Sequence, residues 1–299
     1  MAFGIGINGV LSIKTILRNT EVKKMPEEFK RLTPVEARDF INRNRQGSYV
    51  LLDVRQPAEY EEMHLPGAKL VPLGELDERL DELDRDKPVM AYCRSGKRSS
   101  AASGFLAGRG FPQVLNLEGG ISAWRGEPAM GPPDAGLEYV RGGNATEILS
   151  HAWRMEHHLG GFYRGLAEGL TDRNLADTLE KLAAMEDRHK RSITMLHKNL
   201  TGEELQTDHL TKGDPEALEG GITAGDFLEN NPFLLDDPVS AVESAMAFES
   251  QAMDLYMRYR DEAPDHDSHK ALTALAQEEK NHLRTLSRML DKMTSGKSA

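Results

Sequence analysis

The chain has 299 residues, of which 39% are hydrophobic, and a formal net charge of −11 at pH 7. This length allows two domains with separate cores, and the acidic balance disfavours a nucleic-acid-binding surface, which needs a basic face. A single cysteine excludes a disulfide framework and predicts a reducing, cytoplasmic environment.

Residues 1–31 are predicted to form an N-terminal arm. The stretch contains Gly4-x-Gly6-x-x-Gly9, the nominal dinucleotide-binding fingerprint, but no strand precedes it, so we discount that motif. The apolar opening is too short to span a bilayer and lacks the basic start and cleavage site of a signal peptide. We interpret it as an arm that packs on a partner subunit.

The single cysteine, Cys93, follows the apolar stretch 89–92 and opens a short loop that leads into a helix from about Ser99. Loop amides, the helix dipole and nearby cations all favour a thiolate. The predicted cations are Arg94, Lys97 and Arg98, and the predicted substrate loop contains Ser95, Gly96 and Ser99. Such settings lower a cysteine pKa to about 3.5–7.5, which predicts a nucleophile. The alternative is a small buried hydrophobic side chain.

Four motifs occur in order over residues 32–126: LLDVRQPAEY at 51–60, HLPGA at 64–68, the Cys93 loop, and EGGISAW at 118–124. Together they resemble the rhodanese family. The resemblance implies a parallel α/β domain in which Cys93 takes a sulfane sulfur from a small donor, as a persulfide, and passes it to a thiol acceptor. It also implies that Asp53 and Arg55 are supports near the first strand, that His64 is structural, and that Trp124 is a packing residue.

A phosphatase is the competing interpretation of this loop. Related folds that hydrolyse phosphate esters use Cys-x5-Arg, a loop one residue longer. Here Arg98 closes a Cys-x4-Arg loop, and Ser99 occupies the next position. The shorter loop favours sulfur over phosphate.

Residues 127–142 are predicted to be a linker between domains. Pro128, Pro132 and Pro133 make its first part stiff. The second domain is predicted over residues 143–293 and a loose tail over 294–299.

Four polar residues of the second domain recur at a constant offset of 93 positions: Glu156, Tyr163, Glu186 and His189 return as Glu249, Tyr256, Glu279 and His282. Each set interrupts apolar stripes with three- and four-residue steps, the spacing of one buried helix face. The sequence therefore predicts four helices that each direct a carboxylate into a common core.

Four buried carboxylates without counter-charges would cost several kcal/mol each, and two imidazoles do not neutralise them. Two divalent cations would. We therefore predict a dinuclear metal site, with the ligands Glu156, Glu186, His189, Glu249, Glu279 and His282. This donor set suits iron or manganese, with zinc as a substitute. A single Glu-x-x-His is usually a solvated pair, and the two tyrosines are either outer supports of the site or ordinary core residues.

This pattern resembles the rubrerythrin branch of the ferritin-like superfamily, which implies an all-α four-helix bundle with a crossover from 199 to 238 and a third helix that begins at Asp237-Pro238. Two departures limit the resemblance. Ala252 stands where peroxide-reducing rubrerythrins carry a further Glu, and the chain has no cysteine pair for a rubredoxin-type iron, so any electron donor is external.

The sequence as a whole predicts a sulfurtransferase fused to a dinuclear iron redox domain, in which persulfide made at Cys93 is oxidised or sensed at the metals. One alternative is a peroxide or oxygen reductase with an accessory rhodanese. Another is a metal-stabilised helical dimerisation module. We expect a homodimer with no membrane span and no nucleic-acid partner.

Overall fold

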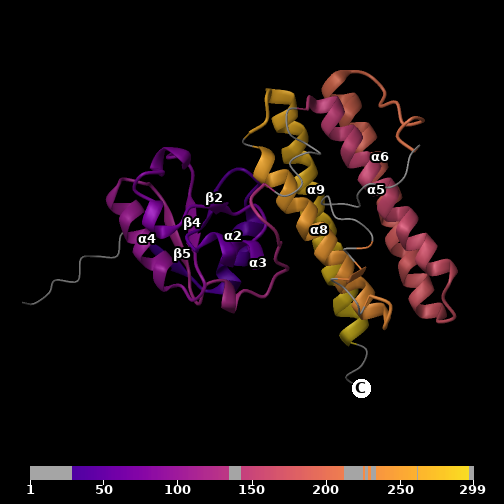
Figure 1. Ribbon diagram of the computed structural model, residues 1–299, viewed down its shortest axis with the longest axis horizontal. Coiled ribbons are helices and arrows are strands. Elements are labelled where there is room, and N and C mark those ends of the chain that lie inside the picture. Colours follow the sequence, from indigo (N-terminus) through magenta and orange to yellow (C-terminus); the bar gives the residue numbers. More distant parts are fainter. Residues whose placement is uncertain are drawn as a thin grey trace, which may run out of the picture.

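The computed structural model describes residues 29–134, 143–211, 225, 228, 229, 234–260 and 262–295. Most of the predicted arm and parts of the predicted linker, crossover and tail lie outside these residues. Figure 1 shows a sheet-containing domain followed by paired long helices. Within the described residues, the apolar content of every helix falls short of what a membrane crossing requires.

The N-terminal domain is built on a five-stranded sheet. Its strands are β1 (Lys30–Leu32), β2 (Val50–Asp53), β3 (Lys69–Leu70), β4 (Val89–Tyr92) and β5 (Val114–Leu117). The order is β1-β5-β4-β2-β3 and every pairing is parallel, which confirms the predicted class. Strand β1 starts two residues before the predicted domain boundary. Asp53 therefore ends the second strand, not the first as predicted.

Both faces of the sheet are covered. Leu52 and Ala91 pack on the side of α4 (Lys97–Gly108), whereas their neighbours Leu51 and Met90 pack on the opposite side. That side is covered by α2 (Pro34–Arg43) and α3 (Pro57–Glu62). Successive strand residues point to opposite faces, and a sheet buried on both faces needs nearly continuous apolar strands. Short 3-10 turns at Leu73–Glu75, Leu80–Glu82 and Ile121–Ala123 complete the domain.

The second domain consists of long helices: α5 (Ala145–Glu168), α6 (Arg173–Thr201), α8 (Pro238–Arg260) and α9 (His266–Ser295). Helix α5 packs along α6, and α8 packs along α9. The side chain of Asp237 accepts the N–H groups of Val239 and Ser240, so α8 begins where the sequence predicted. Helix α9 includes Thr294 and Ser295, so the predicted tail boundary is two residues early.

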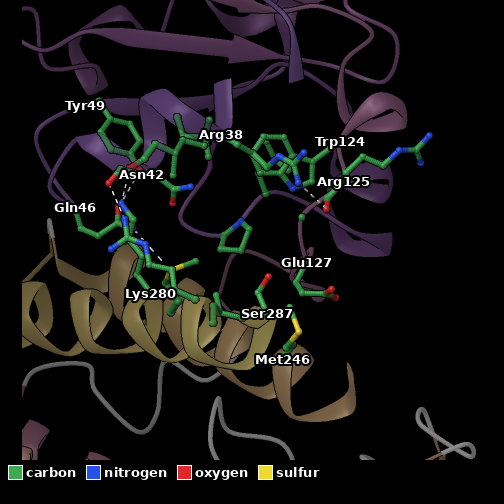
Figure 2. A pocket seen from close by; sticks show the side chains of 18 of the residues that line it. Arg38, Asn42, Gln46, Tyr49, Trp124, Arg125, Glu127, Met246, Lys280 and Ser287 are labelled. Carbon is green, nitrogen blue, oxygen red and sulfur yellow. Dashed lines mark hydrogen bonds between the residues drawn. The ribbon is translucent and has the colours of Figure 1, made fainter. Parts of the chain in front are cut away.

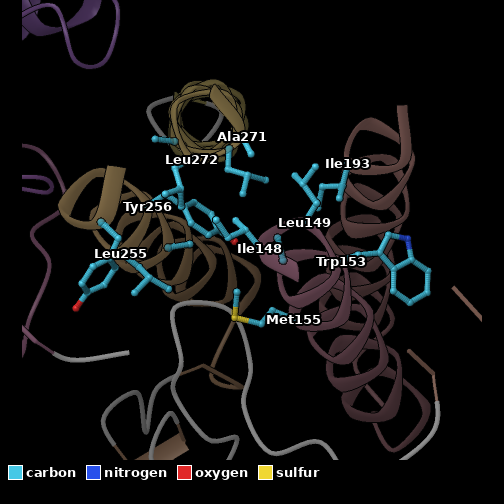
Figure 3. Packing of buried hydrophobic residues seen from close by; sticks show 14 of the residues in the cluster. Ile148, Leu149, Trp153, Met155, Ile193, Leu255, Tyr256, Ala271 and Leu272 are labelled. Carbon is cyan, nitrogen blue, oxygen red and sulfur yellow. The ribbon is translucent and has the colours of Figure 1, made fainter. Parts of the chain in front are cut away.

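The two helical hairpins share a hydrophobic core. Leu149 and Ile193 come from α5 and α6, and Tyr256 and Leu272 come from α8 and α9 (Figure 3). Leu149, Tyr256 and Leu272 are at most 1% exposed. Burial of such side chains contributes about 1.5–3 kcal/mol each, and it positions the polar residues that interrupt the same helix faces.

The first part of the predicted linker is docked on α8. Gln251 exchanges two hydrogen bonds with the backbone of Met130, at 3.0 and 2.9 Å. Ser250 donates to the carbonyl of Pro128 at 3.0 Å, and Arg258 donates to that of Pro133 at 2.6 Å. Residues 127–134 therefore attach the first domain to the helices.

Further contacts join the two domains directly. His64 Nε2 lies 3.2 Å from Asp254 Oδ1 on α8, and both side chains are fully buried. The same carboxylate accepts the Gly67 N–H at 2.9 Å. On α9, Lys280 and Arg284 donate to backbone carbonyls at the end of α2. Helices α8 and α9 thus lie between the sheet domain and the α5–α6 pair (Figure 1).

Candidate functional sites

Cys93 follows β4, the middle strand of the sheet, at its carboxyl end. Ligands of open parallel sheets bind at this edge. The Gly96 N–H lies 3.1 Å from Cys93 Sγ, and Ser99 Oγ lies 3.6 Å from it. Gly96 has φ +86°, and a Cβ there would come within 3.1 Å of the Leu117 carbonyl oxygen. Helix α4 begins at Lys97, two residues earlier than predicted.

Two opposing effects set the ionisation of Cys93. The side chain is 1% exposed, and burial raises the pKa of the thiol. Hydrogen bonds from the Ser99 hydroxyl and from the backbone amides of Ser99, Ser95 and Gly96 act in the other direction, and the pKa is lowered overall. Stabilisation of the anion by inward-pointing amides is the physical basis predicted from the loop.

The three predicted cations do not occupy equivalent positions. Arg98 binds both carboxylate oxygens of Glu59, at 2.7 and 2.6 Å, and lowers the pKa of Glu59 to about 2. Arg94 and Lys97 are exposed. Lys97 lines a hollow of about 440 Å³ beside the loop, together with Arg31 from β1. The sequence motif contained Glu59, but its pairing with Arg98 across 39 positions was not predicted.

Asp53 and Arg55 form a buried pair under the same sheet edge. The Arg55 guanidinium donates to Asp53 at 2.6 and 2.9 Å and to the Met63 carbonyl at 2.7 Å. Asp53 is paired with Tyr92, the residue before Cys93, in the β2–β4 register. These contacts place the pair next to the Cys93 loop, and its role as a support of that loop stays a prediction.

A second chain segment closes against the Cys93 loop. The Ile121 N–H donates to the Cys93 carbonyl at 2.8 Å, and the Ser122 N–H donates to the Arg94 carbonyl at 3.1 Å. Gly120 has φ +59°, and a Cβ there would lie 2.1 Å from the Cys93 carbonyl oxygen. Only glycine permits this approach. The motif at 118–124 therefore holds the carbonyl groups of Cys93 and Arg94 in hydrogen bonds, while the amides of the loop point toward the sulfur.

His64 and Trp124 have the packing roles that were predicted. His64 is fully buried, its Nδ1 lies 2.9 Å from the Tyr60 carbonyl oxygen, and its ring stacks on that of Tyr60. Trp124 packs at the edge of the core on the α2 side of the sheet. Neither side chain lies within hydrogen-bonding distance of Cys93 in the described part of the chain.

The six predicted ligands lie together in the helical domain, where His189 is close enough to share a site with either set of carboxylates, and their short contacts form two matched triads. In the first, His189 Nδ1 lies 3.1 Å from Glu156 Oε2 and 2.9 Å from Glu186 Oε2. In the second, His282 Nδ1 lies 3.2 Å from Glu249 Oε2 and 2.8 Å from Glu279 Oε2. The two imidazoles stack within 3° of parallel. Residues that lie 93 positions apart in the sequence therefore occupy equivalent places in the two triads.

The charges of this cluster fit a pair of cations. All six residues are at most 9% exposed. Each imidazole Nδ1 faces two carboxylate oxygens but carries at most one hydrogen, so donors are fewer than acceptors. Burial raises the pKa of Glu156 to about 8. Burial also acts to raise the pKa of Glu279, but the charge and hydrogen bond of His282, together with the contacts of Glu249 and His189, outweigh it and lower that pKa. Four carboxylates and two imidazoles therefore form a donor set that suits hard or borderline divalent metals.

The residues around the triads are also buried. Tyr163 and Tyr256 are at most 1% exposed and belong to the hydrophobic clusters of the bundle. Their role as outer supports of a metal site stays a prediction. Ala252 is fully buried on α8, one turn after Glu249.

Two family models match the chain in different places. The rhodanese-like domain model matches residues 36–127, and the rubrerythrin model matches residues 240–298, which include α9 and all but the first two residues of α8. The order of the two matches is the order of the two domains in the structure.

Curated relatives resemble a shorter part of the chain. YqhL of Bacillus subtilis, named an uncharacterized protein, is 42% identical over 77 residues, which is 26% of this chain and 61% of that protein. A sulfurtransferase of Allochromatium vinosum is 41% identical over 85 residues, 28% of this chain and 79% of that protein. The thiosulfate sulfurtransferase GlpE of Pseudomonas syringae pv. syringae is 35% identical over 98 residues, 33% of this chain and 89% of that protein. The chain thus spans less than two thirds of the first relative and more than two thirds of the other two.

Among solved structures, a rhodanese-related protein of Thermoplasma volcanium is similar over 32% of this chain and 90% of its own, with 31% identity and a TM-score of 0.29. The sulfurtransferase relatives and the two family models lead to one conclusion. The chain belongs to the rhodanese-like family, and it joins a rhodanese-like domain to a rubrerythrin domain in one polypeptide.

Proposed function

We propose that the chain is a sulfurtransferase with Cys93 as the sulfur carrier. The observation that supports this most directly is the pair of donors, Gly96 N–H and Ser99 Oγ, aimed at Cys93 Sγ. The thiolate attacks the outer sulfur of thiosulfate, the S–S bond of the donor breaks, and sulfite leaves with the electron pair. The thiolate of an acceptor then attacks the outer sulfur of the persulfide and restores the Cys93 thiolate. The relative named a thiosulfate sulfurtransferase supports thiosulfate as the donor.

The test compares the chain with its Cys93→Ser variant. With thiosulfate and cyanide, we expect the unmodified chain to produce thiocyanate and the variant to produce none. Intact-mass measurement after incubation with thiosulfate should show a gain of one sulfur atom, and the single cysteine leaves no ambiguity about its place. Ser100→Ala, beside the loop, serves as the control and should keep the activity. Thiocyanate formation by Cys93→Ser would overturn the proposal.

We further propose that the two Glu-Glu-His triads each hold one iron ion, with manganese or zinc as substitutes. When bound, the metals exchange electrons with an oxidant or reductant supplied by another molecule. The residues themselves supply four anionic oxygens and two neutral nitrogens in a water-poor core, which raises the affinity for divalent ions. The proposal rests on the matched contacts of His189 and His282 with their carboxylates.

Metal analysis after anaerobic isolation tests this site. We expect two metal ions per chain, and a loss of metal in Glu186→Ala and in Glu279→Ala. Glu180→Ala removes an exposed carboxylate from the same helix as Glu186 and should leave the metal content unchanged. Absence of stoichiometric metal from the unmodified chain would refute the assignment. Air-stable zinc with no spectral response to peroxide would favour a metal-stabilised structural module.

We propose, finally, that persulfide made at Cys93 is oxidised or sensed at the metal centre, with dioxygen or peroxide as the oxidant. The buried contacts between the domains support a fixed spatial relation between the two sites. Consumption of the oxidant in the presence of thiosulfate and a thiol should fall to background in Cys93→Ser, while the metal content stays unchanged. Undiminished consumption would exclude the coupling and favour a bundle that acts as a reductase by itself.

A further inference from the structure

A cavity of about 450 Å³ lies between the two domains, and its lining includes neither Cys93 nor any residue of the two triads. Its walls come from α2 and the 124–127 segment on one side and from α8 and α9 on the other. Figure 2 shows Asn42 and Tyr49 of the sheet domain opposite Met246 and Lys280 of the helices. Cavities of a few hundred Å³ at domain interfaces are common sites for small ligands.

The lining of this cavity is strongly cationic in a chain that is acidic as a whole. Glu127 is the one carboxylate among the described lining residues. The positive side chains of the lining are Arg38, Arg125, Lys280, Arg284 and Arg288. This excess of positive charge contrasts with the formal net charge of −11 of the whole chain.

Among the described residues, no ion pair neutralises these five cations, and three of them donate to backbone carbonyls. Arg38 donates to the Arg125 carbonyl at 3.2 Å, Arg284 donates to the Asn42 carbonyl at 2.7 Å, and Lys280 donates to the carbonyls of residues 41 and 44. Neutral oxygens accept these bonds. The ion pairs of the described residues are formed by cations outside this cavity, such as Arg55, Arg98 and Arg164. Several cations that converge on one cavity produce a potential that favours an anion.

The remainder of the lining is apolar. It includes Ile41, Leu51, Leu65, Met246, Met253 and Leu283. Trp124 adds an aromatic ring, and its indole Nε1 is buried without a hydrogen-bond partner in the structure. A buried donor without a partner costs about 1–3 kcal/mol, and an oxygen of a bound ligand would remove that cost.

We propose that this cavity binds a small organic anion that has an aromatic or alkyl body and a carboxylate, sulfonate or phosphate group. Arg38 and Arg284 hold the charged group from the two domains, and the body lies on Trp124 and Met253. The ligand would contact α8 and α9 on the side that faces the sheet domain; these helices carry Glu249 and Glu279. This site is distinct from the proposed sulfur and metal sites, and its test depends on neither.

Two fluorescent probes with one body test the proposal on the full-length chain. 8-Anilinonaphthalene-1-sulfonate carries a sulfonate, and N-phenyl-1-naphthylamine is the same ring system without it. We expect the sulfonate probe to bind saturably, with one site per chain and about tenfold tighter than the neutral probe, equivalent to ~1.4 kcal/mol. Equal affinity of the two probes, or absence of saturable binding, would overturn the proposal.

Matched arginine variants locate the probe. Arg38→Gln and Arg284→Gln should each weaken binding of the sulfonate probe about tenfold, with little effect on the neutral probe. Arg85→Gln is the control, because Arg85 also donates to a backbone carbonyl, that of Arg109, but lies outside the cavity. If all three variants bind the sulfonate probe as tightly as the unmodified chain does, the cavity is not its site. Circular dichroism confirms that each variant is folded.

Discussion

Ionisation of Cys93 depends at the residue scale on a few short contacts. Removal of the Ser99 hydroxyl should raise the pKa of the thiol, because that hydroxyl donates to the sulfur and stabilises its anion. For Ser99→Ala we expect the acid limb of the pH profile of kcat/KM for thiosulfate to move to higher pH. At pH values above the pKa of the Cys93 thiol, kcat/KM should change less. The control is Ser100→Ala, which removes a hydroxyl that accepts from Arg31 instead. Equal pH profiles for Ser99→Ala and the unmodified chain would contradict this account.

Gly120 determines whether the 118–124 segment can close against the Cys93 loop. Gly120→Ala should lower the free energy of unfolding by more than about 2 kcal/mol, because alanine is strained at φ +59° and its Cβ meets a backbone carbonyl. Sulfur transfer should be lost with it. Gly108→Ala in α4 is the control, since no atom lies within 4 Å of the added carbon. Denaturant titration of both variants gives the comparison.

The sequence specified the identity of the site residues better than their partners. Cys93 and the six Glu and His residues could be predicted as site candidates, because a loop motif and a helical period are local patterns. The pairing of Arg98 with Glu59 could not, because both are polar residues and their contact joins α3 and α4, two helices that cover opposite faces of the sheet. The position of Arg31 at the hollow was missed for a related reason: β1 is a three-residue edge strand that lacks an apolar run.

At the scale of helices and strands, the residues that cap the start of a helix contribute to its stability. The capping box of α5 is formed by Asn144 and Glu147, with hydrogen bonds of 3.0 and 3.1 Å. Asn144→Ala should lower the free energy of unfolding of the bundle by about 1 kcal/mol, since the Glu147 amide at the helix start loses its acceptor. Asn174→Ala, at an exposed position of α6, is the control and should change stability by less than about 0.5 kcal/mol. Thermal or urea unfolding followed at a helix signal measures both.

The apolar stripes predicted the four helices, but α8 differs from a one-sided helix in a way that its sequence did not reveal. Ser250, Gln251 and Asp254 are buried although they face away from the triads, because the sheet domain covers them. Polar residues at such positions look like a solvated face. The structure shows that they are instead hydrogen-bonded across the domain interface.

That interface is the main feature at the scale of the whole molecule. Burial raises the pKa of Asp254, but Arg258 and His64 outweigh it and hold the pKa below the ordinary value of 3.8. A depressed folded-state pKa means that the carboxylate contributes stability above pH 3.8, and that this contribution is lost as pH falls through the folded-state value. Docking of the domains should therefore persist at pH values near 4.

Hydrogen exchange at Gly67 reports this docking, because its N–H donates to Asp254. In Asp254→Asn we expect the Gly67 amide to exchange at least about tenfold faster, since the substitution removes the charge that Arg258 and His64 stabilise. The control is Asp187→Asn, which alters an ion pair on the surface of the bundle. Unchanged protection of Gly67 in Asp254→Asn would show that the interface does not depend on this carboxylate.

The solitary thiol of the chain has a kinetic consequence. Cys93 is the chain's one cysteine, so no neighbouring sulfur can resolve its persulfide as an internal disulfide. In the proposed mechanism each turnover must then wait for a second molecule, and donor and acceptor occupy the same carrier in succession. Such a double-displacement order predicts parallel lines when reciprocal initial rates are plotted against reciprocal donor concentration at several acceptor concentrations. By this mechanism the chain would store one activated sulfur atom between the two half-reactions.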